Sequence, residues 1–232
     1  MAVLYGEVLR IDVNAWADRD RFVISKGHAA AAVYATLAEV GLLTDEDLAT
    51  FGADGSRLFG HVTKSGYDAI EVSTGSLGHG LPMAGGMALV GHRQHKPWRV
   101  IAVLSDGEMD EGSNWEALLF AAHNELDNLT IVIDYNQIQS LDLVEKTIRL
   151  EPLVDKLSAF GWSAVEVDGH DIGALREVLT SLPREPGKPT AVVARTVKGK
   201  GVSFMEGTVL WHYRSPAGEE LERALAEIEA MP

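Results

Sequence analysis

The sequence predicts an α/β fold, with a mostly parallel sheet that carries helices on both faces. Short continuous apolar runs, typical of strands buried on both sides, alternate with longer segments of helical character. At 99–135 a strand, a helix and a second strand follow one another as a β–α–β unit, which makes the two strands parallel. We expect a single domain over 1–232, because no linker or internal repeat divides the chain.

The first 80 residues are predicted to contain helices and one long loop. Residues 1–12 look like part of a helix that begins without a capping residue. Residues 29–41, rich in alanine and leucine, should form a helix that ends at Gly41, and Thr44 should cap a short helix after it. Residues 52–80 are rich in Gly, Ser and Thr and too long for a simple connection, so we expect a functional or a disordered loop.

The sheet and most of its covering helices should come from the second part of the chain. Helical character returns at Leu81. Four apolar runs are expected to be strands, at 99–104, 129–135, 163–168 and 190–196. Further helices are expected at 113–126, at 172–182 and at 219–230, the last with Leu221, Ala224, Leu225 and Ile228 on one face.

The composition excludes several classes of protein. A formal net charge of −14 argues against nucleic-acid binding, because that function needs a basic surface to neutralise phosphates. The absence of cysteine excludes disulfides, thiolate metal sites and a cysteine nucleophile. No apolar run reaches the roughly 18 to 20 residues of a membrane span, and the first residues lack the sections of a signal peptide. We expect a soluble, cytoplasmic protein that does not bind membranes.

Two polar residues follow neighbouring strands of the predicted β–α–β unit. Asp106 comes just after the strand at 99–104, and Asn136 just after the strand at 129–135. The carboxyl ends of parallel strands meet at one edge of the sheet, which is where ligands bind in such folds. Carboxylate, amide and carbonyl oxygens suit Mg²⁺ or Ca²⁺, with water and phosphate as the remaining ligands. The alternative is that Asp106 and Gly107 form a plain turn and that the acidic residues are solvated.

The helix predicted after this turn carries a capping-box pattern. In SNWE, Ser113 would accept a hydrogen bond from a backbone N–H of the first turn, and Glu116 would reach back to the cap. We therefore expect Glu116 to have a structural role.

The segment from Ser105 to Asn136 resembles the thiamine diphosphate motif of transketolases, which begins with Gly-Asp-Gly and ends further along in Asn. Its interior EG and its ending DYN match that motif, and Ser105 replaces the first glycine. The resemblance implies a thiamine diphosphate-binding fold. It also implies that Asp106, Asn136 and the carbonyl of Ile138 hold Mg²⁺ or Ca²⁺.

Further motifs in the same order extend the resemblance over nearly the whole chain. They are SKGHAA at 25–30, GH at 60–61, EVSTGSLGHG at 71–80, RTVKGKG at 195–201 and LWHY at 210–213. The resemblance implies that eight residues bind the cofactor: His28, Gly75, Leu77, Asp106, Gly107, Glu108, Asn136 and His212. It implies three catalytic residues, His28, His61 and His212, and histidines can donate to phosphate and move protons near neutral pH. For Glu111 it implies a subunit contact.

The resemblance further implies a transketolase reaction, in which a two-carbon ketol unit passes from a ketose or its phosphate to an aldose or its phosphate. Thiamine diphosphate would supply the carbanion chemistry, and the protein would supply position and electrostatics. The family's pyrimidine-binding and C-terminal domains lie outside these 232 residues, so we expect the partner in an oligomer to be a C-terminal transketolase subunit. The family's N-terminal Ser-Gly-His segment is expected to be absent as well.

Two alternatives remain open from the sequence. One is another thiamine diphosphate enzyme, such as a deoxyxylulose phosphate synthase or the α subunit of a keto-acid dehydrogenase. The segment ELDNLTIVIDYN favours transketolase over both. The other alternative is a degenerate subunit that binds its partner but neither cofactor nor substrate.

Overall fold

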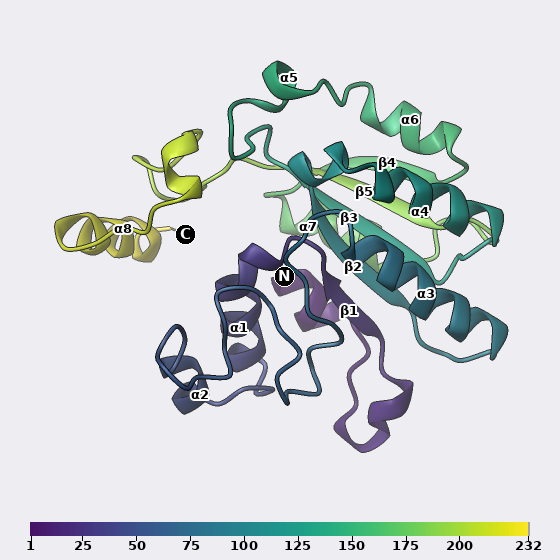
Figure 1. Ribbon diagram of the computed structural model, residues 1–232, viewed down its shortest axis with the longest axis horizontal. Coiled ribbons are helices and arrows are strands. Elements are labelled where there is room, and N and C mark those ends of the chain that lie inside the picture. The colour runs from purple at the N-terminus through teal and green to yellow at the C-terminus, as the bar shows by residue number, and fades with distance from the viewer. Residues whose placement is uncertain (232) are drawn as a thin grey trace.

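The computed structural model describes residues 1–231 and confirms the predicted α/β fold (Figure 1). Its strands are β1 (Arg21–Ile24), β2 (Val100–Ser105), β3 (Leu129–Tyr135), β4 (Ser163–Asp168) and β5 (Thr190–Arg195). They form one five-stranded sheet in the order β1-β2-β3-β5-β4, and every neighbouring pair is parallel. Nearly all side chains of the central strand β3 are buried, which explains its continuous apolar run.

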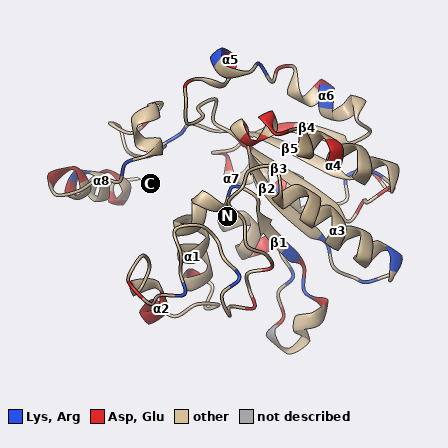
Figure 2. Ribbon diagram, in the orientation of Figure 1, with Lys and Arg blue, Asp and Glu red and all other residues tan. Residues whose placement is uncertain are grey.

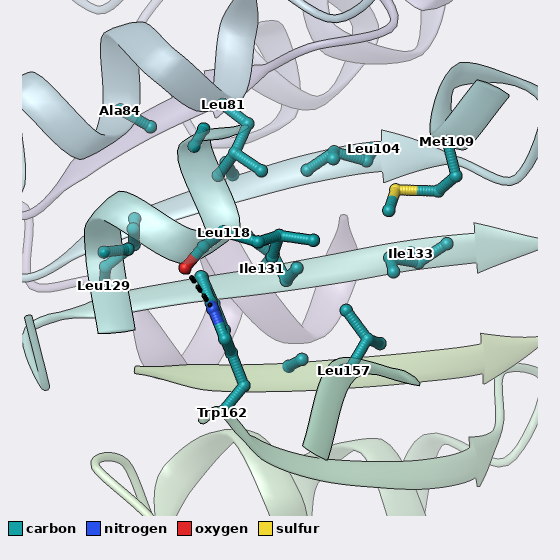
Figure 3. Packing of buried hydrophobic residues seen from close by; sticks show 14 of the residues in the cluster. Leu81, Ala84, Leu104, Met109, Leu118, Leu129, Ile131, Ile133, Leu157 and Trp162 are labelled. Atoms are coloured by element: carbon teal, nitrogen blue, oxygen red, sulfur yellow. Dashed lines mark hydrogen bonds between the residues drawn. The ribbon is translucent and has the colours of Figure 1, made fainter. Parts of the chain in front are cut away.

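Helices cover both faces of the sheet, as expected. On one face lie α3 (Gly80–Arg93), α4 (Gly112–His123) and α6 (Leu153–Ala159). On the other lie α1 (Ala30–Glu39), α7 (Ile172–Thr180) and the π-helix Leu4–Val8. Figure 3 shows the core of the first face, where the Trp162 indole Nε1 donates to the Leu118 carbonyl at 3.0 Å. This bond satisfies the one polar group that the buried indole carries.

The remaining elements are shorter or lie outside the two helical layers. The helices are α2 (Asp45–Ala49), α5 (Val144–Thr147) and α8 (Glu219–Glu229), and the 3-10 helices are Val13–Asp18, Gly27–Ala29, Gly107–Asp110 and Val209–His212. Acidic side chains gather on α2 and α8, at the outside of the molecule (Figure 2). None of the helices within residues 1–231 is both long and apolar enough to cross a bilayer.

The four predicted strands agree with β2 to β5 to within one residue at each end. The helix predicted at 29–41 is α1, and Gly41 follows it with a φ of 71°. The predicted cap of α2 is confirmed, because Thr44 Oγ1 accepts from Asp47 N at 3.0 Å. β1, α5 and α6 were not predicted. The apolar run of β1 is only three residues long and lies next to charged residues, so it lacks the signal of a buried strand.

The predicted capping box at 113–116 is wrong. α4 begins one residue earlier, at Gly112, and its N-cap residue Glu111 makes no side-chain hydrogen bond there. Ser113 Oγ instead donates to the Gly78 carbonyl at 2.8 Å, because the long loop before α3 lies directly against the start of α4. The hydroxyl therefore joins two elements, and does not cap its own helix.

The ends of the chain agree with the predictions in part. The predicted first helix is confined to the short π-helix Leu4–Val8. The predicted terminal helix forms as α8, but only Ala224 of its apolar face is buried. Leu221, Leu225 and Ile228 are 43%, 51% and 47% exposed, so most of this face is uncovered.

Candidate functional site

A cavity of about 80 Å³ lies at the carboxyl edge of the sheet, where the segments after β1, β2, β3 and β5 meet. Its lining joins residues that are far apart in the sequence: Lys26, His28, Leu77, Ser105, Asp106, Gly107, Asn136, Ile138, Gln139, Ser140, Lys198 and His212. The lining includes every predicted site residue except His61, Gly75 and Glu108. The structure therefore brings together most of the residues that the sequence analysis singled out.

Asp106 follows β2 directly and is 1% exposed. Its Oδ1 accepts from Gly107 N at 2.7 Å, and its Oδ2 accepts from Gln137 N, just after β3, at 2.5 Å. Burial raises the pKa of Asp106 to about 6, because the backbone donors replace only part of the lost hydration. A cation beside the carboxylate would favour its charged form again.

Three oxygen donors at this cavity fit a divalent cation. Asn136 Oδ1 accepts from Ile138 N at 3.1 Å, across a turn in which Gln137 has a φ of 66°. Asp106 offers a carboxylate, Asn136 an amide oxygen and Ile138 a backbone carbonyl. These three kinds of oxygen suit Mg²⁺ or Ca²⁺. Within residues 1–231, no three His, Asp or Glu side chains are grouped so as to hold a metal alone. Water or phosphate would have to complete the coordination.

Two lysines that the sequence analysis did not select also line the cavity. Lys26 follows β1, and its Nζ pairs with the carboxylate of Asp134 in β3. Lys198 follows β5, and burial lowers its pKa, with Lys26 adding to the shift. Both lie inside the motifs SKGH and VKGKG, so the signal was present in the sequence. Two ammonium groups at one cavity suit an anionic ligand.

His28 and His212 lie side by side at the cavity, with ring centroids 5.5 Å apart and an interplanar angle of 50°. Burial lowers the pKa of His28 to about 4, and the neighbouring positive Lys26 adds to the shift. Burial, with Lys198, also lowers the pKa of His212. Both rings are therefore neutral near pH 7, and each can accept a proton at one ring nitrogen while donating from the other.

The long loop before α3 is ordered against the same edge of the sheet. Thr74 Oγ1 donates to the carbonyl of Ile24, the last residue of β1, at 2.7 Å. Gly75 lies against the His61 ring, since a Cβ at Gly75 would be 3.3 Å from His61 Cδ2. Of this loop, Leu77 reaches the cavity. His61 and Gly75 are not among the residues that line it, so their predicted contacts with substrate and cofactor stay predictions.

Glu108 lies outside the lining of the cavity, in a buried position. Its carboxylate accepts from the Ser25 hydroxyl, from Gly78 N at 2.9 Å and from Ser105 N at 3.4 Å. Burial raises its pKa. These bonds tie the long loop to the ends of β1 and β2, and the predicted cofactor contact of Glu108 stays a prediction. Glu111 is exposed next to it, and its predicted subunit contact also stays a prediction.

The fold and the cavity define an α/β protein with a polar cavity at the carboxyl ends of its parallel strands, where such folds bind ligands. Residues 1–227 match the family model described as "Transketolase, thiamine diphosphate binding domain". The chain therefore belongs to the transketolase family, and the matched region is its thiamine diphosphate-binding domain.

Two relatives agree with this assignment. Over 230 residues the chain is 41% identical to an apulose-4-phosphate transketolase subunit of Actinobacillus succinogenes, covering 97% of this chain and 82% of the relative. It is 39% identical to the 6-deoxy-6-sulfo-D-fructose transketolase subunit SqwG of a Clostridium species, covering 99% of this chain and 84% of the relative. The word subunit in both names implies that those proteins work with a partner chain. The chain is accordingly part of a transferase of the transketolase type, whose reaction is two-carbon ketol transfer.

Solved transketolases share the fold. The transketolase of Leishmania mexicana superposes with a TM-score of 0.89 at 33% identity, covering 98% of this chain and 36% of that chain. The transketolase of Campylobacter jejuni superposes with a TM-score of 0.87 at 27% identity, covering 98% of this chain and 37% of that one. The chain thus spans little more than a third of these transketolases.

Proposed function

We propose that the chain binds thiamine diphosphate and Mg²⁺ in the cavity at the carboxyl edge of the sheet. With a partner subunit, it would then transfer a two-carbon ketol unit from a ketose phosphate to an aldose phosphate. The observation that carries this proposal is the convergence of three oxygen donors, two lysines and two neutral histidines on one cavity. We treat 1–232 as one domain of that assembly, and its cytoplasmic location stays a prediction from the sequence.

Two groups of residues at the cavity would share the binding of the cofactor and its metal. Asp106, Asn136 and the Ile138 carbonyl would hold the Mg²⁺. Lys26 and Lys198 would neutralise the oxygens of the diphosphate. Because the protein supplies only part of the coordination and the diphosphate would complete it, metal binding and cofactor binding should depend on each other.

The bound cofactor would supply the carbon nucleophile that ketol transfer requires. His28 and His212 would orient the hydroxyl groups of the sugar, and would accept or return protons at a ring nitrogen. Gly107 keeps the backbone after β2 free of a side chain, since a Cβ there would lie 2.8 Å from Gln139 Cβ. The chain's own residues would thus hold the cofactor, neutralise its charge and relay protons around it.

A partner subunit would complete the site. Relatives named as transketolase subunits support this proposal. We propose that the partner contributes the pyrimidine-binding and C-terminal domains and that the assembly is an oligomer. Glu111, exposed at the start of α4, is the residue that we place at the subunit contact.

Ketol transfer by the full chain mixed with a partner subunit that carries the pyrimidine-binding and C-terminal domains tests the proposal. The donors to try first are those in the relatives' names, apulose 4-phosphate and 6-deoxy-6-sulfofructose, each with an aldose phosphate as acceptor. We expect transfer that requires both thiamine diphosphate and Mg²⁺. Binding of the partner, with neither cofactor binding in calorimetry nor transfer from any donor, would favour the degenerate subunit instead.

The metal assignment has its own test. Asp106→Asn keeps the shape of the side chain but removes its charge, so Mg²⁺-dependent binding of thiamine diphosphate should weaken by about tenfold or more in calorimetry. Asp155→Asn, on the exposed side of α6, is the matched control and should bind as the wild type does. Equal affinities for the two variants would overturn the role of Asp106 as a ligand.

A further inference from the structure

The segment after β5 carries Lys198 to the cofactor cavity, and a second cavity lies beside it. Val197, Lys198 and Gly199 line this second cavity of about 550 Å³, together with residues of α1 and α7. On that side the segment borders the cavity, so fewer side chains pack against it there. The position of Lys198 therefore depends on the hydrogen bonds of the backbone around it.

One of these bonds comes from His170, in the turn after β4. Val197 N donates to His170 Nε2 at 2.8 Å. His170 is fixed in turn, since its own N donates to Asp168 Oδ1 at 2.8 Å. Gly169 N donates to the carbonyl of Arg195, the last residue of β5, at 2.7 Å. The turn after β4 is thus attached to the end of β5, and the imidazole of His170 contacts the backbone N–H of Val197.

The surrounding bonds show why this one matters for the cavity. Thr196 Oγ1 donates to the Asp134 carboxylate, which also pairs with Lys26. Lys198 O accepts from Gly207 N at 2.9 Å, on the far side of the segment. The Val197 bond lies between these two, so it completes a continuous set of bonds from one cavity lysine to the other.

The chemistry of the bond defines the state of His170. Nε2 must be an acceptor, so the proton of the neutral imidazole lies on Nδ1. His170 lines the larger cavity and is not part of the lining of the cofactor cavity. It can therefore influence the cofactor only through the backbone that it holds.

We propose that His170 is a positioning residue for cofactor binding, which sets the place of Lys198 at the diphosphate through its bond to Val197 N. The inference rests on the proposed function, in which Lys198 neutralises the diphosphate. It extends that function to a residue in the turn after β4, outside the lining of the cofactor cavity.

Hydrogen exchange tests the geometry in the full chain without any cofactor. His170→Leu removes the acceptor, whereas His170→Gln places an amide oxygen at about the position of Nε2. We expect the amides at 197–201 to exchange about threefold to tenfold faster in the leucine variant, and at the wild-type rate in the glutamine variant. Wild-type exchange in both variants would overturn the proposal, whatever the chain's function. If the leucine variant does not fold, His170→Asn, whose amide is too short to reach Val197 N, replaces it.

A double-mutant cycle with Lys198 tests the consequence for binding. Calorimetry would measure the affinity of the full chain for thiamine diphosphate and for inorganic pyrophosphate, each with Mg²⁺. We expect His170→Leu to weaken binding about threefold to tenfold, His170→Gln to restore it, and Lys198→Met to abolish the effect of His170→Leu.

The outcomes of the cycle separate the two proposals. Additive effects of His170→Leu and Lys198→Met would mean that His170 acts on stability in general and not through Lys198, which would overturn the inference. If the wild-type chain binds neither probe, the proposed function fails, while hydrogen exchange still decides the role of His170.

Discussion

Burial shifts the pKa values of Asp106 and His28 in opposite directions, and both shifts favour the neutral side chain. For Asp106 the pKa rises to about 6, because a carboxylate loses its hydration there. For His28 it falls to about 4, because the imidazolium would lose its hydration and would also lie near Lys26. A divalent cation at Asp106 and an anionic cofactor beside the lysines would oppose both shifts, so ligand binding should bring each pKa back toward its ordinary value.

The low pKa of His28 should affect stability. Its folded value of about 4 lies below the value of 6.5 for an unperturbed histidine. Between these two values the unfolded chain takes up a proton that the folded chain does not, so the free energy of unfolding should decrease as the pH falls through this window. His28→Gln should flatten that part of the profile in urea denaturation of the cofactor-free chain. His92→Gln, exposed on α3, should leave the slope as it is, and equal slopes for all three chains would contradict the shift.

Gly78 is a position in the long loop that cannot accept a side chain. Its φ is 82°, and a Cβ would lie 2.4 Å from Ser113 Oγ and 2.6 Å from Glu111 Cβ. Gly78→Ala should lower the free energy of unfolding by about 2 to 4 kcal/mol, from the positive φ and the overpacking together. Gly52→Ala has a similar φ of 76° with nothing within 4 Å, so only about 1 to 2 kcal/mol should be lost in urea denaturation. Equal losses would show that the contacts around Gly78 give way.

At the scale of elements, a charged network adds to the three buried apolar residues that hold β1 in the sheet. Asp20, directly before β1, accepts from Arg10 N at 3.0 Å and from Arg99 N at 2.8 Å. Its carboxylate also pairs with both guanidinium groups, at 2.8 Å and 2.6 Å. Burial alone would raise the pKa of Asp20, but the hydrogen bonds from Arg10 and Arg99 lower it to about 2. The network joins β1 to β2, and β1 leads to Lys26 and His28.

Removing the charge of Asp20 should therefore affect both stability and the cofactor cavity. Asp20→Asn leaves two arginines without their buried partner, so the free energy of unfolding should fall by about 3 to 5 kcal/mol in urea denaturation. Binding of thiamine diphosphate should weaken as well, because β1 positions Lys26. Asp18→Asn, exposed two residues earlier, is the control and should change stability by less than about 0.5 kcal/mol. A loss no larger than this for Asp20→Asn would show that β1 is held by its apolar residues.

These elements also show what could be predicted from the sequence. β3 and β4 were predicted at both ends, because a buried strand leaves a continuous or alternating apolar pattern in its own residues. β1 was missed, since the partners that hold it come from other segments. The capping box at Ser113 was wrong for the same reason, because its hydroxyl finds Gly78, which is 35 residues away. Local patterns predict local structure, and they do not reveal partners that only the folded chain brings close.

At the scale of the molecule, the strand order determines which residues meet. β2 and β3 are neighbours, so the Asp106 and Asn136 that follow them could be placed together from the β–α–β unit alone. β1 and β5 flank this pair in the order β1-β2-β3-β5-β4 and add Lys26 and Lys198 to the same edge. The β–α–β unit alone does not place the two lysines together, because their meeting depends on the order of strands that are distant in the sequence, although the motifs that contain them were recognised. Acidic residues are also numerous on the outer helices α2 and α8 (Figure 2).

This arrangement predicts that metal and cofactor stabilise the folded chain jointly. Mg²⁺ alone would meet few protein ligands next to two lysines, and thiamine diphosphate alone would lie beside the Asp106 carboxylate without a screening cation. Together each offsets the charge of the other, so thermal unfolding should shift little with either and clearly with both. At free concentrations about 100 times the dissociation constant, the gain in the free energy of unfolding should be about 2.7 kcal/mol. A chelator should reverse it, and Lys26→Met should reduce it. The same shift with thiamine diphosphate alone would show that the cofactor binds without any role for the metal.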